Sequence, residues 1–145
     1  MHRSSARSSR SSLALRSGLL GAAQADELNV VRKVTYEGNT SLENVRDGAF
    51  AGYKKLDLTG IKKATLLTFV LDPAQNPGGE IEVRLDKPDG KLLGKVTAPA
   101  KRGLSTLVTG LEGESGFHDL YVVFKNPQAG EKSMFYFGGI QLQNK

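Results

Sequence analysis

Apolar and polar residues alternate along most of this sequence after residue 28. The alternation is clearest in Glu80–Asp86, where Ile81, Val83 and Leu85 are separated by charged residues. Successive side chains of a β-strand point to opposite faces, so this segment predicts a strand with one buried and one solvated face. In the same part of the chain, apolar residues do not keep a helical spacing for three turns, and the pattern therefore favours strands throughout.

The strands are separated by residues typical of turns. Lys87–Lys91 contains a proline, which presets a turn dihedral, and a glycine, which accepts a positive φ, so the strands on either side should form a hairpin. The other predicted strands are Asn29–Tyr36, Phe50–Leu56, Ala64–Leu71, Leu92–Val96, Ser105–Thr109, Phe117–Lys125 and Met134–Gln143. Seven or eight short strands at this spacing predict an all-β fold, an antiparallel β-sandwich of the jelly-roll type.

The beginning of the chain has a different composition. Residues 1–14 are rich in Ser and Arg and hold no large apolar residue between Met1 and Leu13, so they predict a disordered basic tail or a targeting segment, followed by the sandwich at 15–145. Residues 13–25 imitate a secretory signal in outline, but Arg16 interrupts the apolar part. An organelle transit peptide, a linker and an internal start codon explain the same residues. We expect a secreted or periplasmic location.

The overall composition excludes several classes of function. Four arginines, at positions 3, 7, 10 and 16, carry most of the formal net charge of +5, so the remainder is nearly neutral and does not predict a nucleic-acid-binding surface. The sequence has no cysteine, which excludes disulfides and thiolate chemistry. No apolar run approaches the ~20 residues of a membrane span.

Three segments, in this order, carry a resemblance to a known family. They are Gly52–Gly60, Gly79–Gly94 and Gly116–Phe124, and the last is the most specific. They resemble the family 6 carbohydrate-binding modules, and Gln24–Glu27 is similar to the first strand of those modules. The resemblance implies a non-catalytic module that binds a polysaccharide or oligosaccharide beside a neighbouring catalytic domain. The alternative is a structural accessory domain of a larger exported enzyme that has lost sugar binding.

The residues that the resemblance places in the sugar cleft depart from the family pattern. The family clamps a sugar between two loop aromatics and fixes it with an asparagine on the last strand. In this sequence the two aromatic positions fall near Asn44 and near Leu104, and the asparagine position falls at Tyr136. The chain has no tryptophan. The prediction is therefore a degenerate or remodelled cleft, in which Tyr136 supplies a ring and Asn44, Asp47 and Glu37 supply hydrogen bonds. The alternative for Tyr136 is a half-buried strand aromatic with its hydroxyl in water.

Two further groups of residues bear on a metal site and on catalysis. The family often holds a structural calcium, and Gln24 and Asp26 alternate so that both oxygens could face one ion, but the position of the partner aspartate is Gly138. Calcium is therefore an optional structural ion, and no cofactor is expected to be required. His118 alternates with Leu120, Val122 and Phe124, which predicts a core histidine, and no catalytic residue is expected.

Overall fold

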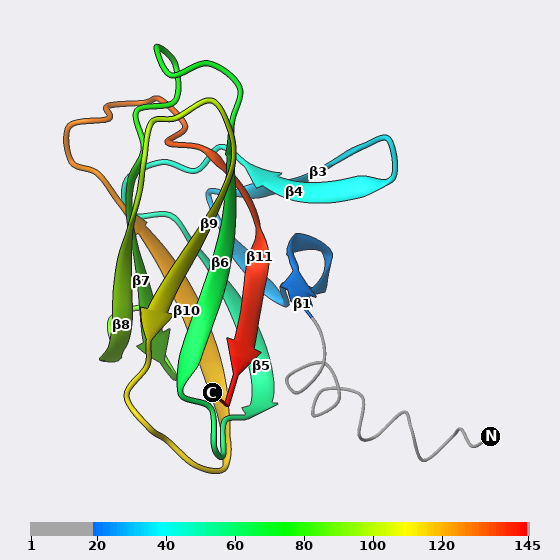
Figure 1. Cartoon of the computed structure of the whole chain (residues 1–145), viewed down its shortest axis with the longest axis vertical. Helices are drawn as coiled ribbons and strands as arrows, with labels where there is room; N and C mark the ends of the chain where they lie inside the picture. The colour runs from blue at the N-terminus through cyan, green and yellow to red at the C-terminus, as the bar shows by residue number, and fades with distance from the viewer. Residues whose placement is uncertain (1–18, 145) are drawn as a thin grey trace.

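The structure is a computed structural model that describes residues 19–144, and it consists of two antiparallel β-sheets packed face to face (Figure 1). One sheet has the strand order β3-β4-β11-β6-β9, with β1 pairing to β11. Its strands are β1 (Leu19–Gly21), β3 (Arg32–Tyr36), β4 (Asn39–Glu43), β6 (Lys63–Val70), β9 (Gly103–Gly110) and β11 (Tyr136–Gln143). We call this the six-stranded sheet.

The second sheet has the order β2-β5-β10-β7-β8 and is called the five-stranded sheet. Its strands are β2 (Glu27–Asn29), β5 (Phe50–Asp57), β7 (Gly79–Leu85), β8 (Lys91–Ala98) and β10 (Phe117–Lys125). A short 3-10 helix, η1 (Ala22–Gln24), lies between β1 and β2 in the chain. All pairings between these strands are antiparallel, and consecutive strands often belong to different sheets. The all-β antiparallel sandwich predicted from the sequence is confirmed.

The core lies between the sheets and is built from the inward residues of both. Phe124 of β10 contacts Phe135 and Phe137 edge to face, with ring centroids 5.8 and 5.3 Å apart, and all three rings are fully buried. Edge-to-face packing is the favoured arrangement of aromatic pairs. These contacts join the two sheets through residues that are next to one another only in the folded chain.

The predicted hairpin around Lys87–Lys91 is present as β7 and β8. The predicted strand Asn29–Tyr36 is instead two strands in different sheets, because Val30 has a φ of 71° and ends β2. A β-branched residue rarely adopts a left-handed φ, so the sequence pattern gives no sign of this break. β4 was not predicted either, since Leu42 is the single large apolar residue in Asn39–Glu43.

The β3–β4 hairpin projects away from the body of the sandwich (Figure 1). Glu37 and Gly38 at its tip both have a positive φ, 52° and 84°, as the tight turn of a two-residue hairpin loop requires. The hairpin pairs with β11 through Leu42 opposite Phe137, and Leu42 is fully buried. Its side chains therefore form a wall that stands beside the outer face of the six-stranded sheet.

Candidate functional site: a furrow on the six-stranded sheet

A hollow of about 610 Å³ lies between the β3–β4 hairpin and strands β6 and β11. Tyr136 of β11 pairs with Phe69 of β6, so both rings face outward at the same height of the sheet. The other lining residues come from the hairpin and from the end of β6, and are Val34, Tyr36, Asn39, Ser41, Glu43 and Leu71. The site thus combines aromatic and aliphatic walls with a few polar groups.

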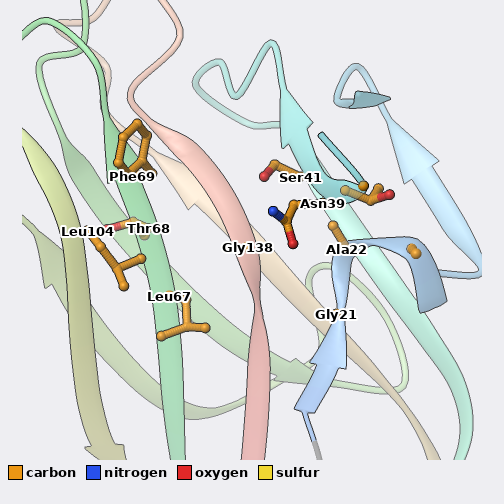
Figure 2. A pocket seen from close by; sticks show the side chains of 12 residues that line it. Gly21, Ala22, Asn39, Ser41, Leu67, Thr68, Phe69, Leu104 and Gly138 are labelled. Atoms are coloured by element: carbon orange, nitrogen blue, oxygen red, sulfur yellow. The ribbon is translucent and has the colours of Figure 1, made fainter. Parts of the chain in front are cut away.

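A second hollow, of about 650 Å³, continues this one along the sheet toward β1. Both hollows are lined by Asn39, Ser41 and Phe69, so we treat them as a single furrow. Figure 2 shows Phe69, Leu67 and Leu104 on one side of β11 and Asn39 and Ser41 on the other. Gly138, which lies on β11 between these walls, carries no side chain, and the floor of the furrow is therefore low there.

The furrow follows from an uncommon pattern in β6. Ala64, Leu66 and Val70 are buried in the core, while Leu67 and Phe69 point to the outer face. A strand of an antiparallel sheet normally has one apolar and one polar face, so β6 and its continuation into Leu71 carry extra apolar surface. Phe69 is 39% exposed and Leu104, opposite it on β9, is 67% exposed.

Tyr136 is the predicted sugar-site residue that lies in the furrow, and it is half-buried. The Asn44 amide donates a hydrogen bond of 3.0 Å to the Val30 carbonyl, and Asp47 Oδ1 accepts one of 2.8 Å from the Asn126 amide. Both side chains thus hold loops of the chain, and neither residue lines the two hollows. Glu37 lies at the exposed hairpin tip, also beyond the lining.

Tyr36, Phe69 and the polar residues of the hairpin line the furrow but were not predicted from the sequence. Tyr36 is 75% exposed, and it faces the furrow because β3 pairs with β4 through Tyr36 opposite Asn39. The sequence does carry one indication of Phe69, because apolar residues occupy both faces of β6. Such a strand is typical of a sheet whose outer face binds an apolar surface. The hairpin residues carried no comparable signal.

The electrostatic character of the furrow is close to neutral. Glu43 is the one charged residue among those that line the two hollows, and its carboxylate pairs with the Arg32 guanidinium at 3.1 Å. The remaining polar groups are the side chains of Asn39, Thr40, Ser41 and Thr68 and the tyrosine hydroxyls. Such a surface suits a ligand with apolar C–H faces and neutral hydroxyls.

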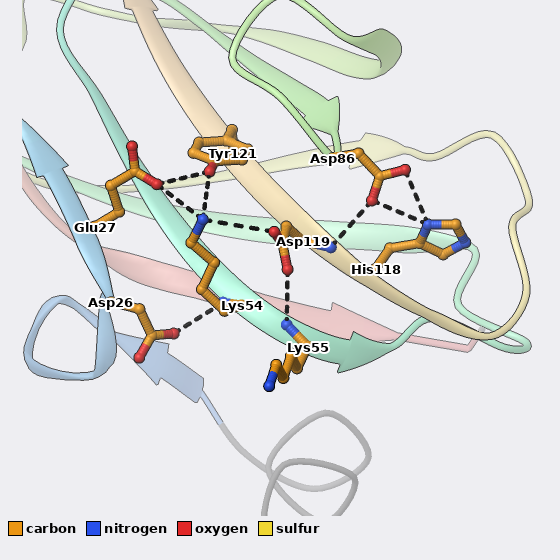
Figure 3. Close-up of polar contacts among 8 residues, drawn as sticks. All are labelled: Asp26, Glu27, Lys54, Lys55, Asp86, His118, Asp119 and Tyr121. Atoms are coloured by element: carbon orange, nitrogen blue, oxygen red, sulfur yellow. Dashed lines mark hydrogen bonds and ion pairs between the residues drawn. The ribbon is translucent and has the colours of Figure 1, made fainter.

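The outer face of the five-stranded sheet has the opposite character, because a polar network closes it (Figure 3). Lys54 Nζ lies 2.8 Å from the Tyr121 hydroxyl and 2.9 Å from Glu27 Oε1, and Tyr121 donates a 2.7 Å hydrogen bond to the same Glu27 oxygen. Asp119 Oδ2 is 3.5 Å from the Lys54 ammonium. We call Glu27, Lys54, Asp119 and Tyr121 the lysine network.

The lysine network shifts the pKa values of its members in the directions expected for satisfied partners. The hydrogen bond from Tyr121, followed by that from Lys54, lowers the pKa of the Glu27 carboxyl. The same two bonds, to Tyr121 first and then to Glu27, raise the pKa of the Lys54 ammonium. Burial raises the pKa of the Tyr121 hydroxyl. Glu27, Lys54 and Tyr121 therefore keep their ordinary charges around neutral pH.

His118 is not a core residue, and that prediction was wrong. A β-bulge between His118 and Leu120 breaks the alternation of β10, and the imidazole is 24% exposed. Its Nδ1 lies 3.1 Å from both carboxylate oxygens of Asp86, and its Nε2 lies 2.9 Å from the Ser115 carbonyl. The contact with Ser115 involves the carbonyl oxygen, so no activated hydroxyl is formed. Burial lowers the pKa of His118, but the bonds to Asp86 and Ser115 outweigh it and raise the pKa overall.

The predicted calcium ligands were tested against the contacts around η1. Asp26 Oδ2 accepts a 2.8 Å hydrogen bond from the Lys54 backbone amide, and Gln24 offers a neutral amide oxygen. Position 138, where the family has an aspartate, is a glycine without a side-chain oxygen. Residues 19–144 contain no group of three or more His, Cys, Asp and Glu side chains that could hold a metal ion. Calcium prefers six to eight oxygens, with carboxylates among them, so these residues do not fit the ion.

Comparison with known proteins identifies the fold and its family. A family model described as Carbohydrate binding module (family 6) matches residues 22–144. The chain belongs to this family. As a family 6 module it is a non-catalytic carbohydrate-binding module, which confirms the resemblance predicted from the sequence. The helices described within residues 19–144 include none that is long and apolar enough to cross a bilayer.

Solved structures of family 6 modules share this fold. A β-1,3-glucan-binding family 6 module from Bacillus halodurans superposes with a TM-score of 0.75, at 21% identity, over 86% of this chain and 94% of that one. A glycoside hydrolase family 43 arabinoxylan arabinofuranohydrolase from Bacillus subtilis, in complex with cellotetraose, gives a TM-score of 0.74 at 22% identity. That match covers 88% of this chain and 27% of the hydrolase.

A curated relative is also a larger enzyme that contains such a module. The arabinoxylan arabinofuranohydrolase of Paenibacillus polymyxa is 33% identical over 95 residues, which is 63% of this chain and 14% of that protein. The chain therefore spans about one seventh of the length of this relative.

Proposed function

We propose that this module binds a neutral β-linked polysaccharide along the furrow of the six-stranded sheet, with the rings of Tyr136 and Phe69 as the stacking surface. The observation that carries the proposal is the pairing of these two outward rings in a hollow whose opposite wall also presents the polar side chains of Asn39 and Ser41. Pyranose rings present apolar C–H faces, which pack on aromatic rings, and hydroxyl groups at their edges.

The polar wall of the furrow supplies the remaining contacts. Asn39 and Ser41 face the shared part of both hollows and can exchange hydrogen bonds with sugar hydroxyls. Since the lining contains no Lys, Arg or His, it offers no counter-charge for uronic acids or sulfated sugars. Glu37 lies beyond the hairpin end of the furrow and would contact only a polysaccharide that is longer than the furrow. Asn44 and Asp47 act indirectly, by fixing the loops beside the furrow.

The choice of a β-linked ligand follows the proteins that are similar to this chain. One of them binds β-1,3-glucan and another is bound to cellotetraose. By analogy with the arabinofuranohydrolases, the module holds a neighbouring catalytic domain close to its polysaccharide, so that repeated encounters become intramolecular. We propose accordingly that the chain itself has no catalytic activity, requires no cofactor, and acts outside the cell or in the periplasm.

Affinity electrophoresis of the full chain in gels that contain xylan, mixed-linkage β-glucan or laminarin tests this function. We expect retardation by at least one of these polysaccharides, and a loss of affinity of about tenfold in each of Tyr136→Ala and Phe69→Ala. Phe117→Ala is the matched control, since Phe117 is a 66% exposed aromatic residue that does not line the furrow. The proposal fails if folded Tyr136→Ala and Phe69→Ala variants bind as tightly as the wild type.

A second candidate is a structural accessory domain that packs on a neighbouring domain and has lost sugar binding. The observation that favours it is the commitment of Asn44 and Asp47 to hydrogen bonds within the chain. The same gels distinguish the two functions, because an accessory domain would show no retardation on any of the polysaccharides.

A further inference from the structure

The turn that leads from β1 into β2 is held by side-chain donors at three alternate carbonyl groups. The Tyr53 hydroxyl donates a 3.1 Å hydrogen bond to the Gly21 carbonyl. The Lys33 ammonium donates to the Ala23 carbonyl at 2.9 Å and to the Ala25 carbonyl at 3.1 Å. The turn is a single 3-10 helix of three residues, so its carbonyls depend on such outside partners.

Both donors come from strands of the sandwich, and each sheet supplies one. Lys33 belongs to β3 of the six-stranded sheet, whereas Tyr53 belongs to β5 of the five-stranded sheet and is almost completely buried. Burial raises the pKa of the Tyr53 hydroxyl, which therefore stays a protonated donor. The two side chains thus attach the entry turn to both layers.

The Lys33 ammonium lies between the carbonyls of the two residues that flank Gln24. Of the two side chains that the family resemblance would offer to calcium, Gln24 and Asp26, only Asp26 carries a carboxylate, and its Oδ2 already accepts a hydrogen bond from the Lys54 backbone amide. Gln24 Oε1 lies beside Gly21, 2.9 Å from the position that a Cβ atom would take there, and Gly138 brings no second carboxylate. A divalent cation at these two side chains would find too few anionic ligands, and the carbonyls of Ala23 and Ala25 beside them already accept hydrogen bonds from the Lys33 ammonium.

We infer that the Lys33 ammonium, assisted by the Tyr53 hydroxyl, performs in this module the task that a structural calcium ion performs in its family, namely fixing the turn before β2. The cation that stabilises the turn is thus part of the polypeptide. The turn then keeps its conformation without a metal, and calcium has no site there.

Thermal unfolding of the full chain in excess CaCl2 and in excess EDTA is the first test. The midpoint temperature should be the same in both solutions, since a ligand that binds only the folded state would raise it. A midpoint that rises with CaCl2 and falls with EDTA would overturn the inference. This measurement is independent of sugar binding, so its outcome leaves the proposed function untouched.

The second test replaces the donor. Lys33→Met keeps the length of the aliphatic stem but removes the ammonium, and we expect the midpoint to fall by roughly 3–6 °C, given the strength of hydrogen bonds from charged groups. Lys101→Met is the matched control, because Lys101 is exposed and makes no side-chain hydrogen bond or ion pair with residues 19–144. Tyr53→Phe removes one hydroxyl only, and should lower the midpoint by less.

Amide hydrogen exchange supplies a local measurement that a general loss of stability would not reproduce. In Lys33→Met, the amides of Ala25 and Asp26, which bond to Ala22 and Gly52, should exchange faster at temperatures where β7 and β10 stay fully protected. The inference is wrong if Lys33→Met has the same midpoint temperature as Lys101→Met and its Ala25 and Asp26 amides exchange as slowly as in the wild type.

Discussion

The two outer faces of this sandwich use aromatic residues in opposite ways. On the five-stranded sheet, Tyr121 is 4% exposed, packs edge to face on Phe50 with centroids 5.6 Å apart, and shares its hydroxyl with the lysine network. On the six-stranded sheet, Tyr36 and Phe69 leave much of their ring surface in solvent. An aromatic ring can stack on a sugar only where other parts of the chain do not already cover it.

The difference shows that aromatic content alone does not identify a binding face. Gly52 lies directly under the Tyr121 ring, and a Cβ atom there would come within 2.6 Å of Cε2, so the glycine makes room for the ring to lie flat. On the five-stranded sheet, Tyr121 therefore contributes to stability and offers little ring surface to a ligand. The six-stranded face keeps its rings accessible, and this supports placing the ligand there.

The largest expected effect comes from truncating a ring on each face. Tyr121→Ala should reduce the free energy of unfolding by about 3–5 kcal/mol, because it removes a buried ring together with its packing. Tyr36→Ala should change it by less than about 0.5 kcal/mol, as is usual for an exposed side chain. Urea unfolding followed by circular dichroism measures both.

The comparison would be wrong if the two variants lost similar amounts of stability. A large loss in Tyr36→Ala would show that the furrow is a structural surface of this chain. A small loss in Tyr121→Ala would show that the lysine network and the Phe50 contact contribute little to the folded state.

An intermediate effect is expected beneath the furrow, at Thr68. This residue is 1% exposed, and its Oγ1 has no hydrogen-bond partner among residues 19–144. Burying an unpaired hydroxyl is unfavourable, so Thr68→Val should raise the free energy of unfolding by about 1 kcal/mol. A destabilised Thr68→Val would show that the hydroxyl has a partner in solution.

The smallest effect concerns pH and His118. The histidine faces Asp86 and the Ser115 carbonyl, Glu114 adds to the negative potential, and the folded pKa is raised above the ordinary 6.5. Protonation therefore stabilises the fold, and this contribution is complete below pH 6.5 and is lost as pH rises through the folded pKa. Unfolding experiments on either side of that range should show the decline in the wild type and little of it in Asp86→Asn. Equal pH profiles would exclude the pair as its source.

Much of the fold was predictable because strand alternation is a local signal. The segments now seen as β5, β6, β7, β8, β9, β10 and β11 were all predicted within a few residues of their ends. The wrong predictions have local causes that the pattern of apolar and polar side chains does not reveal. At Val30 the positive φ directs the chain from one sheet into the other, and the bulge after His118 takes the imidazole out of the apolar alternation of β10.

The candidate site was less predictable, since it depends on which strands become neighbours. Tyr136 was found through the family resemblance, whereas Phe69 enters the site because β6 pairs with β11. Asn39 and Ser41 enter because their hairpin, which has little apolar content, folds beside β6 and β11. These are non-local pairings, and no spacing along the sequence encodes them.

The position of β11 has a consequence for how this molecule is made. The strand lies between β4 and β6 in the middle of its sheet and also pairs with β1. Of the two rings that contact Phe124, Phe137 belongs to β11 and Phe135 directly precedes it. During synthesis from the N-terminus, the six-stranded sheet consequently lacks its centre until residues 136–143 leave the ribosome. Pairings this distant in sequence close slowly, so a nascent chain keeps β4 and β6 apart, with their edges open, until the last strand is inserted.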